Sequence, residues 1–234
     1  PNTNVMWGVY CDASFCYGAH EDGNITKTWK NNGTVVWNVQ PSTNQMNGIS
    51  CAATFCYGAH VGGYLTKTWK DNDISLDVLR DQTIAVIGYG IQGDAQANNM
   101  KDSGLNVIVG LKEGGTSWKK AKSDGHKVMS VSDACKQADI IHVLLPDMIQ
   151  SQVYKDEIGP YLSSGKALSF SHAAAIHWKW IEAPNNVDII MVAPKGPGSK
   201  VRETYLENFG IPAIVAVHQD FTGKAWDRTL GIAK

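Results

Sequence analysis

Three features are missing from this sequence, and each absence argues against a class of function. Its 21 Lys and Arg residues are balanced by 22 Asp and Glu residues, which leaves a formal net charge of -1. Without excess positive charge, nucleic acid and an anionic membrane surface are not expected partners. No apolar run reaches the length of a membrane span, and no basic-then-apolar leader opens the sequence, although a leader could have been removed. These absences predict a soluble protein with neither nucleic acid nor membrane as a partner.

An internal repeat occupies residues 1–72. Residues 1–20 align with residues 41–60, and the sequence Thr-Lys-Thr-Trp-Lys recurs at the same offset of 40. Such self-similarity indicates one supersecondary unit used twice. Short strands with turn signals between them resemble a blade of a β-propeller, with strands of the first unit expected at 9–11, from 15, at 25–29 and at 34–39. Two blades cannot close a propeller, so the segment is either a fragment of a longer array or pairs its edges with another chain.

Only one of the 5 cysteines lies outside this repeat. The other four stand at equivalent places in the two units, as Cys11, Cys16, Cys51 and Cys56. Each Cys-x4-Cys could close a disulfide or contribute two small buried hydrophobic side chains, and sequence alone leaves both readings open. A histidine four residues after each pair makes a metal site conceivable. No complete ligand set with finger-like spacing is present, so no metal site is predicted.

The strongest motif follows the repeat, at residues 83–110. An apolar, β-branched run at 84–87 is typical of a buried parallel strand, and Gly88, Gly90 and Gly93 then supply the pattern Gly-x-Gly-x-x-Gly. In this pattern the first glycine permits a tight turn, the second lets a pyrophosphate approach bare backbone, and the third lets the helix pack closely on the strand. A helix and a second strand at 107–109 complete the unit. The motif predicts a dinucleotide site with phosphates at the helix N-terminus.

The remainder of the chain alternates strands with helices. The repeat stops at Asn72, so a second domain is expected over 73–225. Further strands are expected at 126–129, 139–145, 166–170, 188–193 and 212–217, with a capped helix at 130–138. Strands alternating with helices imply an α/β fold, a Rossmann-like doubly wound parallel sheet with helices on both faces, preceded here by the small all-β tandem-repeat segment.

Five motifs in this second part are too particular for a general Rossmann reading. They are residues 88–93 (GYGIQG), 145–150 (LPDMIQ), 170–172 (FSH), 192–198 (VAPKGPG) and 216–220 (AVHQD). In this order they resemble the N-terminal NADP-binding domain of ketol-acid reductoisomerase, also called acetohydroxy-acid isomeroreductase. The resemblance runs from about residue 74 to the end, and it implies that residues 226–234 begin a helical domain that continues beyond this sequence. The sequence departs from the family at Ile91, at Asp94 and in the alanines that follow His172.

The resemblance implies a role for each matching residue. The glycine turn would hold the pyrophosphate through Gly88, Tyr89, Gly90, Ile91, Gln92 and Gly93. Asp147 and Gln150 would lie beside the adenine half, and Gly198 would bring backbone close to the nicotinamide. His172 matches the family's catalytic histidine, and Lys195 matches its lysine near the substrate oxygens and metals. His142, His177 and His218 are interpreted as structural.

Cofactor choice depends on the loop after the second strand. A carboxylate there would grip the ribose hydroxyls of NAD, whereas cationic and hydroxyl groups favour the 2′-phosphate of NADP. Lys112 stands where the family often has Arg and keeps its charge, and Ser117 follows. Glu113 weakens the case, but the sequence favours NADP(H).

The resemblance also implies a function. The family moves an alkyl group across an acetohydroxy acid under two magnesium ions and then reduces the product with NADPH, in branched-chain amino-acid biosynthesis. The Mg²⁺ ligands would lie outside this chain, so the chain alone is expected to bind NADPH with little or no activity. A small-molecule substrate, a homo-oligomer and a cytoplasmic location are further expectations. The alternative is a binding or assembly protein in which the repeat does the work and the Rossmann unit is a nucleotide sensor or passenger. Whether the join near Asn72 is natural, engineered or an error in the assigned sequence is left open.

Overall fold

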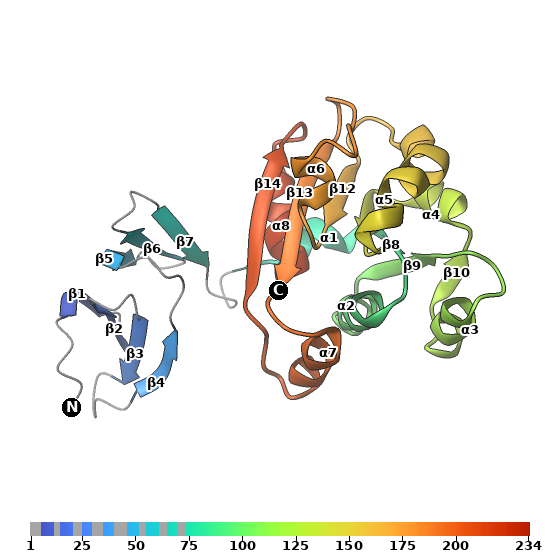
Figure 1. Cartoon of the computed structure of the whole chain (residues 1–234). Helices are drawn as coiled ribbons and strands as arrows, with labels where there is room; N and C mark the ends of the chain where they lie inside the picture. The colour runs from blue at the N-terminus through green and yellow to red at the C-terminus, as the bar shows by residue number, and fades with distance from the viewer. Residues whose placement is uncertain are drawn as a thin grey trace. The chain divides into compact units, whose positions relative to one another are not determined.

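The chain forms two compact units, Pro1–Ile74 and Ser75–Lys234, in the computed structural model (Figure 1). The structure describes residues 74–234 in full. Before residue 74 it describes only the backbone of seven strands.

In the first unit the strands belong to two antiparallel sheets. The first has the order β1-β2-β3-β4 and the second the order β5-β6-β7. Their bounds are β1 Met6–Cys11, β2 Phe15–His20, β3 Ile25–Trp29, β4 Val35–Val39, β5 Met46–Cys51, β6 Phe55–His60 and β7 Leu65–Trp69. The cysteine and metal hypotheses concern side chains in this unit, and those side chains lie outside the described residues.

The second unit is built on a seven-stranded sheet with the order β10-β9-β8-β11-β12-β13-β14. Because β8 is central and the order reverses between β8 and β11, this is the arrangement of a doubly wound dinucleotide-binding sheet. The strands are β8 Thr83–Ile87, β9 Asn106–Gly110, β10 Lys127–Met129, β11 Ile140–Val143, β12 Ala167–Phe170, β13 Asp188–Pro194 and β14 Ala213–Gln219. The Rossmann-like fold expected from the sequence is therefore confirmed.

Helices cover both faces of this sheet (Figure 1). They are α1 Asp77–Arg80, α2 Ile91–Asp102, α3 Thr116–Ser123, α4 Val131–Gln137, α5 Asp147–Val153, α6 Ala174–His177, α7 Gly198–Leu206 and α8 Ala225–Ala233, with a π-helical turn at Tyr154–Ile158 and a 3-10 turn at Gly159–Tyr161. The predicted cap of α4 is present, because the Ser130 hydroxyl accepts a hydrogen bond from the Asp133 backbone N–H at 3.1 Å.

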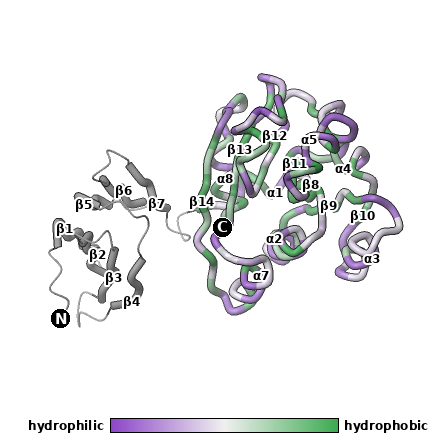
Figure 2. The backbone as a smooth tube through the Cα atoms, in the orientation of Figure 1, coloured by the Kyte–Doolittle hydropathy of each residue, from purple (hydrophilic) through white to green (hydrophobic). Residues whose placement is uncertain are grey.

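The alternation of β8 places its side chains in two cores. Ala85 and Ile87 pack in the layer that contains α4, whereas Ile84 and Val86 pack in the layer that contains α1, α2 and α8. All four are fully buried. The hydrophobic residues run along the central strands (Figure 2), as expected for a parallel strand covered on both faces.

The parallel sheet expected from the sequence is present, with one exception at its edge. Strand β14 runs antiparallel to β13, while the other strand pairs of this sheet are parallel. The reason lies in α7, which does not cross the sheet as a βαβ helix would. It packs on α2 instead, and the chain then returns beside β13 in the opposite direction.

No helix among the described residues is both long enough and apolar enough to cross a membrane.

Candidate functional site

Each glycine of the turn between β8 and α2 has a different setting: one has a positive φ, one makes a close backbone contact and one faces open space. Gly88 has φ +99°, which favours glycine, and a Cβ on Gly93 would lie 2.2 Å from the Gly88 carbonyl oxygen. By contrast, no atom lies within 4 Å of where a Cβ on Gly90 would be. The turn therefore presses α2 onto the end of β8 and leaves open space at its second glycine. This is the shape that a pyrophosphate resting on the helix N-terminus requires.

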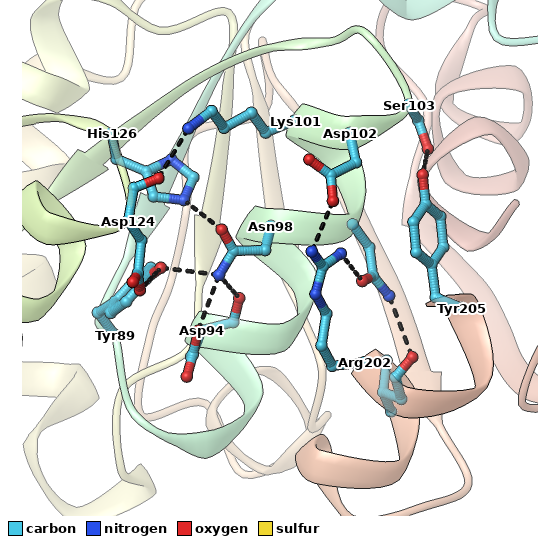
Figure 3. Close-up of polar contacts among 12 residues, drawn as sticks. Tyr89, Asp94, Asn98, Lys101, Asp102, Ser103, Asp124, His126, Arg202 and Tyr205 are labelled. Atoms are coloured by element: carbon cyan, nitrogen blue, oxygen red, sulfur yellow. Dashed lines mark hydrogen bonds and ion pairs between the residues drawn. The ribbon is translucent and has the colours of Figure 1, made fainter. Parts of the chain in front are cut away.

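The side chain of Tyr89 packs inside the protein and does not face this open space. It is 4% exposed, and its hydroxyl donates to Asp124 Oδ2 at 2.8 Å and accepts from Asn98 Nδ2 at 2.9 Å (Figure 3). Burial and the Asp124 carboxylate raise the pKa of the Tyr89 hydroxyl. Only the backbone of Tyr89 is thus available to a phosphate.

A charged cluster ties the first turn of α2 to the end of α3. The ammonium of Lys120 lies 2.8 Å from Asp94 Oδ2 and 2.7 Å from Asp124 Oδ2. Hydrogen bonding to Lys120 lowers the pKa of the Asp124 carboxyl. Because Asp124 also holds Tyr89, the glycine turn and α3 are joined through one carboxylate.

Helix α7 is clamped along α2 (Figure 3). The guanidinium of Arg202 donates to Asn99 Oδ1 at 2.9 Å and to Asp102 Oδ2 at 2.6 Å, and the Tyr205 and Ser103 hydroxyls are 2.9 Å apart. At the start of α7 a Cβ on Gly198 would lie 2.2 Å from the Ile91 carbonyl oxygen. The N-termini of α2 and α7 therefore meet beside the glycine turn. The family resemblance implied a cofactor-site role for Gly198. In the structure, the contact with α2 explains why this position needs glycine.

Ile91 and Gln92 occupy the first turn of α2 with different side-chain surroundings. The Ile91 side chain is 73% exposed. Gln92 Nε2 donates to the Gly196 carbonyl oxygen at 3.0 Å, which ties α2 to the loop that precedes α7. The Gln92 side chain is therefore a structural link, and its backbone N–H lies at the helix N-terminus.

The loop after β9 presents unpaired groups at the start of α3. Lys112 is exposed, Ser117 is half-buried in the first helical turn, and neither side chain has a hydrogen bond or ion pair among residues 74–234. Between them Gly114 has φ +77° and Gly115 caps the helix without a side chain. A free ammonium, a free hydroxyl and helix N–H groups form a donor set that fits a phosphate.

The structure brings three predicted site residues into one chain of hydrogen bonds. His172 Nδ1 lies 2.8 Å from Asp147 Oδ2, and Gln150 Nε2 donates to Asp147 Oδ1 at 3.1 Å. Gln150 is 3% exposed and also donates to the Leu145 carbonyl oxygen at 2.8 Å. The side chains of Asp147 and Gln150 are therefore occupied with His172 and with the turn that follows β11.

Lys195 lies at the end of β13, next to this region of the sheet. Its backbone N–H donates to the Pro212 carbonyl oxygen at 2.9 Å, and its exposed side chain has no partner among residues 74–234. The ammonium is thus free to meet an anionic or carbonyl oxygen. No contact joins it to His172 in the described part of the chain.

A buried polar chain that sequence analysis missed runs beneath the glycine turn. His142 is fully buried, with Nδ1 2.8 Å from Ser169 Oγ and Nε2 2.8 Å from Gln96 Oε1. Gln96 Nε2 in turn donates to Gln92 Oε1 at 3.0 Å and to Ser171 Oγ at 3.2 Å. The chain links β11 and β12 to the helix that would carry the phosphates. The available signal was a polar residue inside each of two otherwise apolar strands.

His142 should make the fold sensitive to acid. Burial lowers the pKa of His142 from 6.5 to about 4, so its stabilising contribution is complete above pH 6.5 and is lost as the pH falls toward 4. A shift of this size corresponds to about 3 kcal/mol. Urea unfolding at several pH values should therefore show a steeper acid loss in the wild type than in His142→Gln. Equal pH slopes in the two proteins would contradict the buried neutral state of His142.

Two further features bear on where ligands could bind. A hollow of about 530 Å³ lies over β12, β13 and β14, and its lining includes Phe170, Met191 and His218 but none of the predicted site residues. The open backbone of Gly90 and the helix N-termini lie at the glycine turn and not in the lining of this hollow. Among the residues the structure describes, no three His, Cys, Asp or Glu side chains are grouped to hold a metal ion.

Comparisons with known proteins agree with this reading of the second unit. Residues 78–234 match the family described as acetohydroxy acid isomeroreductase, NADPH-binding domain. The chain is 88% identical over 162 residues to the ketol-acid reductoisomerase (NADP(+)) of Nitrosopumilus maritimus and 79% identical to that of Cenarchaeum symbiosum, covering 69% of this chain and 49% of each relative. It thus spans about half the length of the curated relatives it matches.

A solved structure supports the same assignment. An NADH-preferring ketol-acid reductoisomerase from an uncultured archean is 49% identical, with a TM-score of 0.67 over 69% of this chain and 50% of that one. The family match begins at residue 78, and the propeller-blade resemblance of residues 1–72 is not borne out. The reading of the Rossmann unit as a passenger is not favoured either. Through residues 78–234, this chain belongs to the acetohydroxy acid isomeroreductase family, of which it carries the NADPH-binding domain.

Proposed function

We propose that the unit Ser75–Lys234 binds NADPH as the cofactor half of a ketol-acid reductoisomerase. The observation that carries this is the contrast within the glycine turn, where Gly93 is pressed against backbone and Gly90 faces open space. The pyrophosphate would rest there on the N–H groups of α2. Gly198 would set the nicotinamide end by bringing the start of α7 against α2.

For the reaction we propose that His172 moves a proton and that Lys195 meets the substrate oxygens. When bound, Mg²⁺ would polarise those oxygens, and NADPH would supply the hydride. Both side chains are exposed at the carboxyl ends of β12 and β13, where an open α/β sheet binds its ligands. An acetohydroxy-acid substrate, a homo-oligomer and a cytoplasmic location belong to the same proposal.

The repeat of residues 1–72 has a separate place in this proposal. We infer an all-β module that is independent of cofactor binding, because the family match begins at residue 78. A chain that starts at residue 74 should then bind NADPH with the affinity of the full chain.

NADP specificity is tested by Lys112→Ala combined with Ser117→Ala. Both groups would donate a charge-assisted hydrogen bond to the 2′-phosphate, at about 1.5 kcal/mol each, the lower end of the usual range, because both are accessible to solvent. The double variant should therefore bind NADPH roughly a hundredfold more weakly. NADH should bind almost as before, since it has no phosphate to lose. Calorimetric titration of both cofactors measures the difference.

A matched control removes a lysine from the opposite helical layer. Lys155 is exposed in the π-helical turn that packs with α4, so Lys155→Ala should leave both affinities unchanged. If the double variant loses NADPH and NADH in parallel, the loop supports the fold and does not read the phosphate. The measurement also shows whether this chain shares the NADH preference named for its solved relative.

A further inference from the structure

The carboxylate of Asp147 contacts His172, a partner that the sequence did not indicate. His172 Nδ1 and Asp147 Oδ2 are 2.8 Å apart, with side chains 64% and 38% exposed. The resemblance places Asp147 beside the adenine. In the structure its carboxylate faces the imidazole of His172.

The carboxylate is held in place from behind. Its Oδ1 accepts from Gln150 Nε2, and the same amide nitrogen donates to the Leu145 carbonyl oxygen. Two acceptors fix the Gln150 amide with its nitrogen toward Asp147. Since Gln150 is 3% exposed, this support is part of the packed turn and not a mobile surface group.

The backbone on the other side of the pair is held as well. His172 follows β12, and the hydroxyl of its neighbour Ser171 donates to the Val192 carbonyl oxygen of β13 at 2.8 Å. Nδ1 is taken by Asp147, so Nε2 is the ring nitrogen without a hydrogen bond among residues 74–234. The ring thus has one fixed nitrogen and one nitrogen available to a ligand.

We propose that Asp147 is a positioning residue for His172. Its carboxylate accepts the Nδ1–H of the neutral imidazole, which leaves the Nε2 lone pair free to take a proton and fixes the direction of the ring. Gln150 acts through Asp147 by holding its second oxygen. This inference rests on the proposed function of His172, but its geometry can be tested without turnover.

Asp147→Asn provides a shape-preserving test. Gln150 Nε2 can only donate, so it keeps the amide oxygen of Asn on its own side. The amide nitrogen then faces His172 Nδ1, which must become an acceptor. Long-range ¹H–¹⁵N spectra of the labelled full chain, recorded where the imidazole is neutral, should show His172 mainly as Nδ1–H in the wild type and mainly as Nε2–H in the variant. A His172→Gln sample assigns the signals.

Controls separate positioning from other roles. Asp133→Ala removes an exposed carboxylate from the first turn of α4 and should leave the His172 tautomer unchanged. Asp147→Ala should also shift the tautomer toward Nε2–H, the form that free histidine favours. NADPH affinity should stay within about twofold of wild type in both Asp147 variants. Either of two results would overturn the proposal: a folded Asp147 variant whose His172 tautomer is unchanged, or a folded Asp147 variant that binds NADPH tenfold more weakly. If the wild type fails to bind NADPH, the proposed function itself is contradicted.

Discussion

Replacing Gly93 with alanine should weaken NADPH binding by roughly a hundredfold or more, which corresponds to about 3 kcal/mol. The new Cβ would lie 2.2 Å from the Gly88 carbonyl oxygen and 2.9 Å from its carbon, and backbone atoms cannot swing aside as a side chain can. Helix α2 would have to move away from β8 by roughly 1 Å, which takes its N–H groups out of hydrogen-bonding range of a phosphate. Overpacking of this kind also costs about 1–3 kcal/mol of stability. Calorimetric titration and urea unfolding measure the two losses.

Two other glycines make the test specific. Gly90→Ala meets no atom within 4 Å, so the fold should keep its stability to within about 1 kcal/mol while NADPH affinity falls, because the methyl enters the space for the pyrophosphate. Gly210→Ala is equally unobstructed, is remote from the turn and should change neither quantity. Wild-type NADPH affinity in both Gly93→Ala and Gly90→Ala would place the cofactor elsewhere.

Breaking the buried ion pair between Arg228 and Asp188 should cost about 3–5 kcal/mol of stability. Arg228 Nη1 lies 2.7 Å from Asp188 Oδ2, and the two side chains are 9% and 0% exposed. The carboxylate also accepts from the backbone N–H groups of Phe221 and Thr222, both at 2.9 Å. Arg228→Leu would leave it buried without a counter-charge. Since this pair holds α8 and the 221–222 turn on β13, the strand that leads to Lys195 should loosen with it.

An exposed pair provides the control for this measurement. Arg80 Nε lies 3.1 Å from Asp77 Oδ1, and the two side chains are 59% and 82% exposed. Arg80→Leu should therefore change the free energy of unfolding by no more than about 1 kcal/mol. Adding Asp188→Asn to Arg228→Leu should recover part of the loss, because the unpaired charge is removed. If Arg228→Leu and Arg80→Leu lower the free energy of unfolding by the same small amount, the buried pair does not stabilise the fold as argued.

The parts of the fold that could be predicted are those determined by short-range patterns. The apolar run at 84–87 and the glycines at 88, 90 and 93 specify strand, turn and helix locally, and these elements are present as expected. The Ser130 cap is a similar local signal. The direction of a strand in the sheet cannot be predicted in this way. A strand at 212–217 can be predicted from composition, but its antiparallel pairing cannot. That pairing depends on where α7 docks, through contacts such as Arg202 with Asp102 that are 100 residues apart in sequence.

The candidate site shows the same limit at the level of side chains. The family resemblance implies that four residues lie near a cofactor, but each of their side chains has a protein partner: Tyr89, Gln92, Asp147 and Gln150. Which partner a polar group meets is decided by how distant segments fold together, as for Asp147 and His172, which are 25 positions apart in the sequence. Lys112 and Ser117 differ, since their lack of partners among residues 74–234 leaves them available to a ligand. No sequence motif predicts the buried hydrogen-bond chain through His142 and Gln96.

If NADPH binds across the N-termini of α2, α3 and α7, as we propose, backbone amide spectra of the ¹⁵N-labelled chain recorded during an NADPH titration should show it. We expect saturable chemical-shift changes concentrated at Gly88–Gly93, at residues 115–117 and at Gly198, and NADH should shift residues 115–117 less than NADPH does. Absence of saturable shifts, or shifts confined to residues that line the hollow over β12, β13 and β14, would contradict it.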